Sequence, residues 1–378
     1  MKLIEDNYFI YDYFRRIAFF QRNRALIKFI EKCKNIDSIK NFNDFRNTLY
    51  RFGIFTESSQ NFLSILCANS ESLLYGHLSS IEHFAEIKKR DLKYFPIMEH
   101  GVTFWEIVNA SGFPRVCQGD YLRENWKRKY PGVPLFCVGP YIHYADYYYS
   151  LEKRTALKKE LGKTLLIVPA HTHEMASQDY DMQGFVDSIM RAKSSYQTVM
   201  VLAYWADLKY PLYDCFINAG AKVVSAGFRG DPYFISRLKT ILSLADIVVG
   251  NDIGTFIGYA HYLKKPVRLL PNTIEYTFRD LTLSQVNREV YQENSKQLYH
   301  AFSDSGDPNM QNALCEKFWG IGHEKTKEEL NQILNINKHI LKYARGNISK
   351  IPDAALRYLN SNEISKSEYL LLKNAISL

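Results

Sequence analysis

Residues 222–271 read KVVSAGFRGDPYFISRLKTILSLADIVVGNDIGTFIGYAHYLKKPVRLLP, and this stretch decides the fold. Its three short apolar runs, KVVSAG, IVVGN and PVRLLP, are typical of strands that are buried on both faces. The segments between them, residues 233–245 and 254–263, carry apolar side chains at helical spacing. Strands that alternate with helices in this way predict a parallel sheet with helices on both sides.

The same alternation begins upstream, with TLLIVPA at residues 164–170 and TVMVLAY at residues 198–204. Helices are predicted between these runs, near residues 184–193 and 213–219. We therefore interpret residues 151–275 as one Rossmann-like domain.

Three further apolar runs, YFPIMEHG, PRVCQGD and PLFCVGP, lie between residues 94 and 140. Helical spacing dominates before them and after residue 275, where Thr326 and Glu329 match a capping box. Residues 1–150 are thus predicted to be a helical front end plus a reduced Rossmann-like domain, and residues 276–378 a helical region that packs back on both domains. The predicted class is α/β, with two Rossmann-like domains facing a cleft and helical additions at both ends.

The charge and composition of the chain restrict the kinds of molecule that it is expected to bind. The 378 residues carry a net charge of +8, which favours an anionic partner, but Lys and Arg are scattered and form no recognised nucleic-acid module. The chain shows no signal-peptide pattern and no apolar run of membrane-spanning length, so a cytoplasmic location is expected. The basic, aromatic residues 15–34 are interpreted as a packed helix, and peripheral contact with an anionic membrane is the alternative.

Candidate binding residues follow the strand IVVG, because ligands of an open parallel sheet bind beyond the carboxyl ends of its strands. Asn251 and Asp252 end this strand, and the next helix is predicted to start at Gly254 and Thr255. Free backbone N–H groups at a helix start, a glycine and a hydroxyl donor suit a phosphate group. The alternative is a strand–helix junction that binds nothing.

Arg229 is a second candidate, because it follows the strand KVVSAG and precedes a helix that Asp231 is predicted to cap. A guanidinium in that position suits a diphosphate. Arg237 and Lys239, within the same helix, are predicted to be solvated.

Titratable side chains follow two other strands. TLLIVPA leads to His171, His173 and Glu174, which are candidates for hydrogen bonding to substrate, with a metal site as the less favoured alternative. YFPIM leads to Glu99 and His100, and a histidine of near-neutral pKa can take a proton from a hydroxyl. The alternative for His100 is a loop histidine bonded to backbone. No metal and no cofactor are expected.

Together, EHG at residues 99–101 and LSLADIVVGNDIGTFIGYAHYLKKPV at residues 242–267 resemble GT-B enzymes of bacterial surface-polysaccharide assembly. The second segment is similar to the donor-side segment of the CDP-glycerol glycerophosphotransferases of teichoic-acid synthesis, and to that of capsule and lipopolysaccharide glycosyltransferases. The family's Asp-containing turn and its "KKP" strand start correspond to Asn251-Asp252 and Lys264-Lys265-Pro266. The family's paired serines are replaced by Gly254-Thr255, so CDP-glycerol is not specified as the donor.

The resemblance implies a metal-independent glycosyltransferase that moves a sugar from a nucleotide sugar to a hydroxyl of a glycan or lipid-linked acceptor. His100 would act as the base, with Glu99 and His173 as further catalytic candidates. Donor binding would fall to Arg229, to His171 and to the turn at residues 251–255. The alternatives are a CDP-polyol phosphotransferase, a nucleotide-sugar 2-epimerase on the same fold, and a non-catalytic membrane-docking protein.

Overall fold

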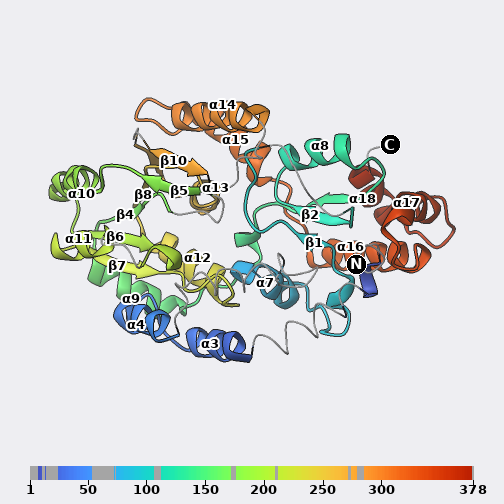
Figure 1. Ribbon diagram of the computed structural model, residues 1–378, viewed down its shortest axis with the longest axis horizontal. Helices are drawn as coiled ribbons and strands as arrows, with labels where there is room; N and C mark the ends of the chain where they lie inside the picture. The colour runs from blue at the N-terminus through green and yellow to red at the C-terminus, as the bar shows by residue number, and fades with distance from the viewer. Residues whose placement is uncertain are drawn as a thin grey trace. The chain divides into compact units, whose positions relative to one another are not determined.

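The computed structural model describes residues 7–10, 13, 24–52, 72, 74–105, 112–171, 176–208, 212–270, 274–278 and 285–376. They form two compact units (Figure 1). Unit 1 takes its residues from Met1–Lys28, Gln60–Ala145 and Cys315–Leu378, and unit 2 from Phe29–Ser59 and Asp146–Leu314. Each unit is built around a parallel sheet, which confirms the predicted α/β class.

The sheet of unit 2 has five parallel strands in the order β7-β6-β4-β8-β9. Their bounds are β4 Thr164–Val168, β6 Thr198–Ala203, β7 Lys222–Ser225, β8 Ile247–Gly250 and β9 Val267–Leu269. Numbered along the chain, this is the order 3-2-1-4-5, in which the strand order reverses between β4 and β8. A doubly wound sheet binds its ligands at that reversal, beyond the carboxyl ends of the strands.

Helices α10 (Met182–Arg191) and α11 (Leu212–Asn218) join strands in one direction across this sheet. Helices α12 (Phe234–Leu244) and α13 (Phe256–Tyr262) join strands in the other direction. Because connections between parallel strands are right-handed, the first pair covers one face and the second pair the opposite face. The contacts agree, since α10 packs on α11, and α12 packs on both α13 and α9 (Leu151–Leu161).

Unit 2 also contains elements outside the predicted domain boundaries. The part of helix α3 (Arg24–Lys34) that starts at Phe29 precedes the sheet in the chain, as does α4 (Phe42–Arg51), and α14 (Gln285–Ala301) follows it. An antiparallel ribbon pairs β5 (Ala176–Asp179) with β10 (Glu275–Phe278), and the sequence pattern did not indicate it. The buried Phe29 of α3 packs edge-on against Phe228, which fits the interpretation of residues 15–34 as a packed helix for the part that is described.

The prediction of a solvated Arg237 was wrong. Its side chain is fully buried and forms an ion pair of 2.5 Å with the equally buried Asp231. The guanidinium also donates to the carbonyl oxygens of Lys34, at the end of α3, and of Ile36, in the loop that follows. Lys239 is buried as well, with 9% of its surface exposed. Arg237 therefore ties the β7–α12 loop to the segment before α4.

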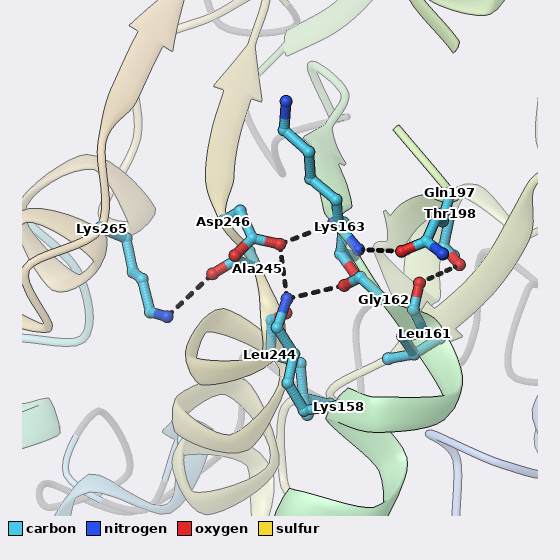
Figure 2. A network of polar contacts seen from close by, with 11 residues as sticks. Lys158, Leu161, Gly162, Lys163, Gln197, Thr198, Leu244, Ala245, Asp246 and Lys265 are labelled. Carbon is cyan, nitrogen blue, oxygen red and sulfur yellow. Dashed lines mark hydrogen bonds and ion pairs between the residues drawn. The ribbon is translucent and has the colours of Figure 1, made fainter. Parts of the chain in front are cut away.

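A polar network surrounds the amino ends of the strands in unit 2 (Figure 2). The ammonium group of Lys158 contacts the Asp246 carboxylate at 2.5 Å and donates to the carbonyl of Leu244 at 3.0 Å. Asp246, which precedes β8, also accepts a 2.6 Å hydrogen bond from the N–H of Thr164 in β4. Burial raises the pKa of Asp246, but the contacts with Lys158 and Thr164 outweigh this effect and hold the pKa below its ordinary value. The network joins α9 to the starts of β4 and β8.

Within the described residues, the sheet of unit 1 has three parallel strands in the order β1-β2-β3. They are β1 (Ile97–Met98), β2 (Arg115–Cys117) and β3 (Leu135–Cys137). Helix α8 (Asp120–Lys129) joins β2 to β3, and α7 (His77–Phe84) precedes β1.

The C-terminal helices of unit 1 are α16 (Lys327–Tyr343), α17 (Ile351–Leu359) and α18 (Lys366–Ile376). The capping box predicted at Thr326 and Glu329 is present at the start of α16. Asn337 of α16 donates to the carbonyl of Tyr94, just before β1, at 2.7 Å. The division between the units falls within α15 (Pro308–Trp319).

Gly119 permits a close backbone approach in unit 1. A Cβ added to Gly119, directly after β2, would lie 2.5 Å from the carbonyl oxygen of Lys317 in α15.

Among the helices of the described residues, none combines the length and the apolar character that crossing a membrane requires.

Candidate functional site

The strand reversal in unit 2 is bridged by Asn251, which follows β8 and is fully buried. Its Oδ1 accepts a 2.7 Å hydrogen bond from the N–H of Ala170, which follows β4. Tyr299 of α14 donates to the Asn251 carbonyl at 2.7 Å. Asn251 thus holds the ends of β4 and β8 and the helix α14 together at the position where this sheet type binds ligands.

Asp252 lies beside this bridge and is 8% exposed. Its Oδ1 accepts a hydrogen bond from the N–H of Ile253 at 2.8 Å. Burial, followed by the charge of Asp207 and that of Asp252, raises the pKa of Tyr180, although a hydrogen bond with Asn251 opposes the shift. The strand edge therefore carries two buried carboxylates close to one tyrosine hydroxyl.

Gly254 and Thr255 precede α13, which has only seven residues and starts at Phe256. A Cβ on Gly250 would lie 2.4 Å from the ring of Phe256, and one on Gly254 would lie 3.3 Å from it. Packing of this ring accounts for the glycine at position 250. A helix of this length has a small dipole, so the Thr255 hydroxyl and the backbone N–H groups are the main features here that suit a phosphate.

Arg229 follows β7, the outermost strand of the sheet, with β6 and β4 between it and β8. Three strand spacings correspond to about 14 Å, so Arg229 and the Asn251 turn leave from strands that are well apart. Its side chain is 6% exposed, with the guanidinium carbon 5.6 Å from the centre of the Trp205 ring.

His171 follows β4 and stacks on Tyr204, which follows β6, with ring centres 4.2 Å apart at an angle of 26°. Both rings are partly exposed. This aromatic pair lies at the ends of the two central strands, beside the Asn251 bridge. His173 and Glu174 lie outside the described residues.

At the carboxyl edge of the unit 1 sheet, Glu99 follows β1 and is 7% exposed. Its carboxylate accepts hydrogen bonds from the N–H of Thr103 at 2.9 Å and of Gln118 at 3.3 Å. Burial raises the pKa of Glu99 to about 7, and these hydrogen bonds oppose the shift without cancelling it. His100, the next residue, is exposed.

The sequence pattern overlooked several residues at these two edges. Asp207 follows the run TVMVLAY and Gln118 follows PRVC, so inspection of the residues after every apolar run finds both. His77 opens α7, and Tyr180 and Tyr299 lie far along the chain from the strand ends that they approach. No local motif marks these three residues.

No protein-family model and no curated protein sequence matches the chain. Solved structures to which it is similar include S. aureus MnaA with UDP, at 13% identity over 62% of each chain and a TM-score of 0.34. The UDP-GlcNAc 2-epimerase of Neisseria meningitidis bound to UDP-GlcNAc is 15% identical over 61% of each chain, with a TM-score of 0.32. A glycosyltransferase of Rickettsia africae is 14% identical over 75% of this chain and 82% of its own, with a TM-score of 0.31. The chain spans about three fifths of the length of the first two.

Proposed function

We propose that the protein transfers a sugar from a nucleotide-activated donor to a hydroxyl of an acceptor in the synthesis of a bacterial surface glycan such as capsule or lipopolysaccharide. The strand reversal between β4 and β8 carries this proposal, because Asn251, Asp252 and His171 gather where a doubly wound sheet binds nucleotides. The GT-B resemblance of residues 242–267 supports the same function.

Unit 2 is the proposed donor-binding unit. The buried carboxylates of Asp207 and Asp252 suit the hydroxyl groups of a ribose or sugar, because a carboxylate at such a strand end accepts hydrogen bonds from hydroxyls. The partly exposed rings of His171 and Tyr204 suit contact with a base or sugar ring. Thr255, Gly254 and Arg229 remain the proposed phosphate-binding residues.

Unit 1 supplies the proposed proton acceptor. A group acts best as a general base when its pKa lies near the working pH, and the buried Glu99 has a pKa of about 7. The exposed His100 beside it is the second candidate. In the transfer step the acceptor hydroxyl gives its proton to one of these groups, its oxygen bonds to the anomeric carbon, and the nucleoside diphosphate leaves with the electron pair of the broken bond.

A thermal-shift screen with UDP, GDP, CMP, CDP and dTDP sugars tests the donor site. One nucleotide class is expected to raise the melting temperature, by an amount that grows with the logarithm of its concentration relative to its Kd. The variant Asp252→Asn is expected to weaken this shift, whereas Asp304→Asn, an exposed position of the same unit, serves as the matched control. No shift with any donor would count against the proposal.

Product analysis separates the remaining alternatives once a donor binds. Release of a nucleoside diphosphate and glycosylation of an added acceptor indicate a transferase. Conversion of the nucleotide sugar without an acceptor indicates a 2-epimerase, and release of CMP from a CDP-polyol indicates a phosphotransferase. Tight binding to anionic liposomes without nucleotide binding would favour the membrane-docking alternative.

A further inference from the structure

Two of the six cysteines lie side by side in the sheet of unit 1. Cys117 is the last residue of β2 and Cys137 the last residue of β3, and the two are register partners in this parallel pair. Their Sγ atoms are 3.5 Å apart, and both thiols are free. Because the two cysteines are 20 positions apart in the sequence, strand pairing rather than a local motif brings them together.

The positions of the two cysteines fit the geometry of a disulfide bond. Adjacent strands are about 4.7–4.9 Å apart, and a disulfide joins residues whose Cα atoms are about 4.4–6.8 Å apart. Register partners also direct their side chains to the same face of a sheet. The Sγ atoms need to approach by about 1.5 Å to reach the S–S bond length of about 2.0 Å. Rotation about the Cα–Cβ bonds supplies movements of this size.

Cys137 is the thiol of the pair that is closer to solvent. It is 8% exposed, whereas Cys117 is 0% exposed. Cys137 donates its S–H to Oδ1 of Asp120 at 3.2 Å, and the Asp120 side chain is 37% exposed. The Cys137 thiol is therefore one hydrogen bond away from a carboxylate that water reaches. Hydrogen peroxide is little larger than water, so it is an oxidant that can reach such a thiol.

The surroundings of the pair give the two thiols different parts in an oxidation. Burial, followed by the hydrogen bond with Cys137, raises the pKa of Cys117 well above its ordinary value, and the charge of Glu99 adds to this shift. The group that attacks an oxidant is a thiolate, and a nearby cation favours its formation. Cys137 has Asp120 as the acceptor of its proton, and Arg123 contacts Asp120 at 2.9 Å. Cys137 is therefore the residue that reacts first, and Cys117 closes the bond.

We propose that Cys117 and Cys137 are a modification site at which a peroxide forms a reversible disulfide bond. Cys137 gives its proton to Asp120, and its sulfur attacks one oxygen of hydrogen peroxide. The O–O bond breaks, the sulfenic acid of Cys137 forms, and the departing hydroxide takes the proton from Asp120 and leaves as water. The sulfur of Cys117 then attacks the sulfur of Cys137, the S–O bond breaks, and the hydroxide leaves as water with the proton of Cys117. The two thiols lose two electrons, one peroxide gains them, and a dithiol reductant restores both thiols by exchange.

The disulfide joins the strand ends next to Glu99. The N–H of Gln118, which follows Cys117, donates to the Glu99 carboxylate at 3.3 Å. The N–H of Val138, which follows Cys137, donates to the Cys117 carbonyl at 3.0 Å. A cross-link between the two cysteines therefore fixes the segment that holds this carboxylate. Formation of the bond does not depend on the proposed transfer reaction and is measured without a substrate.

Peptide mapping of the full chain tests the site. The protein is treated with hydrogen peroxide at neutral pH, the peroxide is removed with catalase, and the remaining thiols are alkylated in denaturant. We expect the number of alkylated thiols to fall by two, a tryptic peptide with Cys117 to be linked to one with Cys137, and dithiothreitol to restore both thiols. A denaturing gel without reductant is expected to show a single-chain band, because the bond lies within one chain.

Three variants identify the reacting sulfurs. Cys137→Ser lacks the thiol that reacts first and is expected to form no linked peptide. Cys117→Ala keeps that thiol and lacks its partner, so the sulfenic acid of Cys137 is expected to accumulate and to react with dimedone. Cys315→Ser, at a buried cysteine of the same unit, is the matched control and is expected to form the bond as the wild type does.

Three results in the wild type would overturn the site. One is that peroxide leaves both cysteines as thiols, and a second is that it converts Cys137 to the sulfinic acid without a link to Cys117. The third is that it joins either cysteine to a different one. The wild-type map does not depend on the folding of any variant, and nucleotide binding in the thermal-shift screen reports on the proposed function separately.

Discussion

At the scale of single residues, the ionisable groups at the unit 1 strand edge have opposite perturbations. Burial raises the pKa of Glu99 to about 7, and burial lowers that of His77 to about 3. Both shifts favour the neutral form of the side chain, as expected where charges are removed from water.

Replacement of His100 with alanine is expected to lower turnover by about 10² or more and to leave the affinity for the nucleotide donor unchanged, because a general base contributes to the chemical step. Steady-state kinetics together with calorimetry of donor binding measure the two effects. His323→Ala, at a partly exposed histidine of the same unit, is the control. Normal turnover in His100→Ala would assign the proton transfer to another group.

Glu99 makes the stability of the protein depend on pH. The pKa of Glu99 is about 7 in the folded state, above the ordinary value of 4.5. The protonated carboxyl therefore contributes its full share to the free energy of unfolding below pH 4.5, and this share is lost as the pH rises through 7. The variant Glu99→Gln cannot ionise, so it does not lose this stability. Between pH 4.5 and pH 8, the free energy of unfolding is expected to fall by roughly 1–3 kcal/mol less in Glu99→Gln than in the wild type. Urea unfolding at both pH values measures this, with the exposed Glu124→Gln as the control. Parallel changes in wild type and Glu99→Gln would contradict the assignment.

The buried ion pair of unit 2 is a second property of single residues. Arg237→Met leaves the Asp231 carboxylate buried without its partner, and a loss of about 3–5 kcal/mol in the free energy of unfolding is expected. The double variant Asp231→Asn/Arg237→Met removes the stranded charge and retains the acceptor for the N–H of Tyr233, so it is expected to recover part of this loss. A double variant that is less stable than the single one would show that the charge itself is not the cause.

At the scale of elements, the network of Figure 2 joins α9 to the starts of β4 and β8. Asp246→Asn weakens the contact with Lys158 and is expected to cost roughly 0.5–1.5 kcal/mol, a small value because the Asp246 side chain is 40% exposed. Since the folded pKa lies below the ordinary 3.8, this stability is present above pH 3.8 and disappears as the pH falls through the folded value. Asp304→Asn, which breaks an exposed ion pair, is the matched control and is expected to cost less. Equal costs for the two variants would contradict a role for the network.

At the scale of the whole molecule, each unit is assembled from separated stretches of chain. Residues 146–314 by themselves lack residues 29–59. They therefore lose the bidentate contact of Arg46 in α4 with Asp214 and the hydrogen bonds of Arg237 to residues 34 and 36. A fragment of residues 146–314 is therefore expected to be much less stable than unit 2 in the intact chain, and fusion of residues 29–59 to its N-terminus through a flexible linker to restore cooperative melting. Circular dichroism and limited proteolysis measure both. Cooperative melting of the short fragment at the temperature of the full chain would contradict this.

The sequence by itself determined the strands of the parallel sheet of unit 2, the helices that join them and the capping box at Thr326, but not the strand β5. These depend on patterns within a few residues, such as buried runs of β-branched side chains and the Thr-x-x-Glu spacing. The alternation of strands and helices also determined that the sheet is parallel, because a crossover helix returns the chain to the same edge.

Only the tertiary structure decided which strand ends meet. The order β7-β6-β4-β8-β9 places Asn251 beside Ala170 and puts two strands between β7, which Arg229 follows, and β8, which Asn251 follows. This order follows from how helices distant in sequence pack on the sheet. The same packing buried Arg237, which local spacing had predicted to be solvated, because the segment after α3 covers it. It also brought His77 and Gln118 to Glu99. Local pattern specifies elements, whereas the composition of a site depends on contacts between elements.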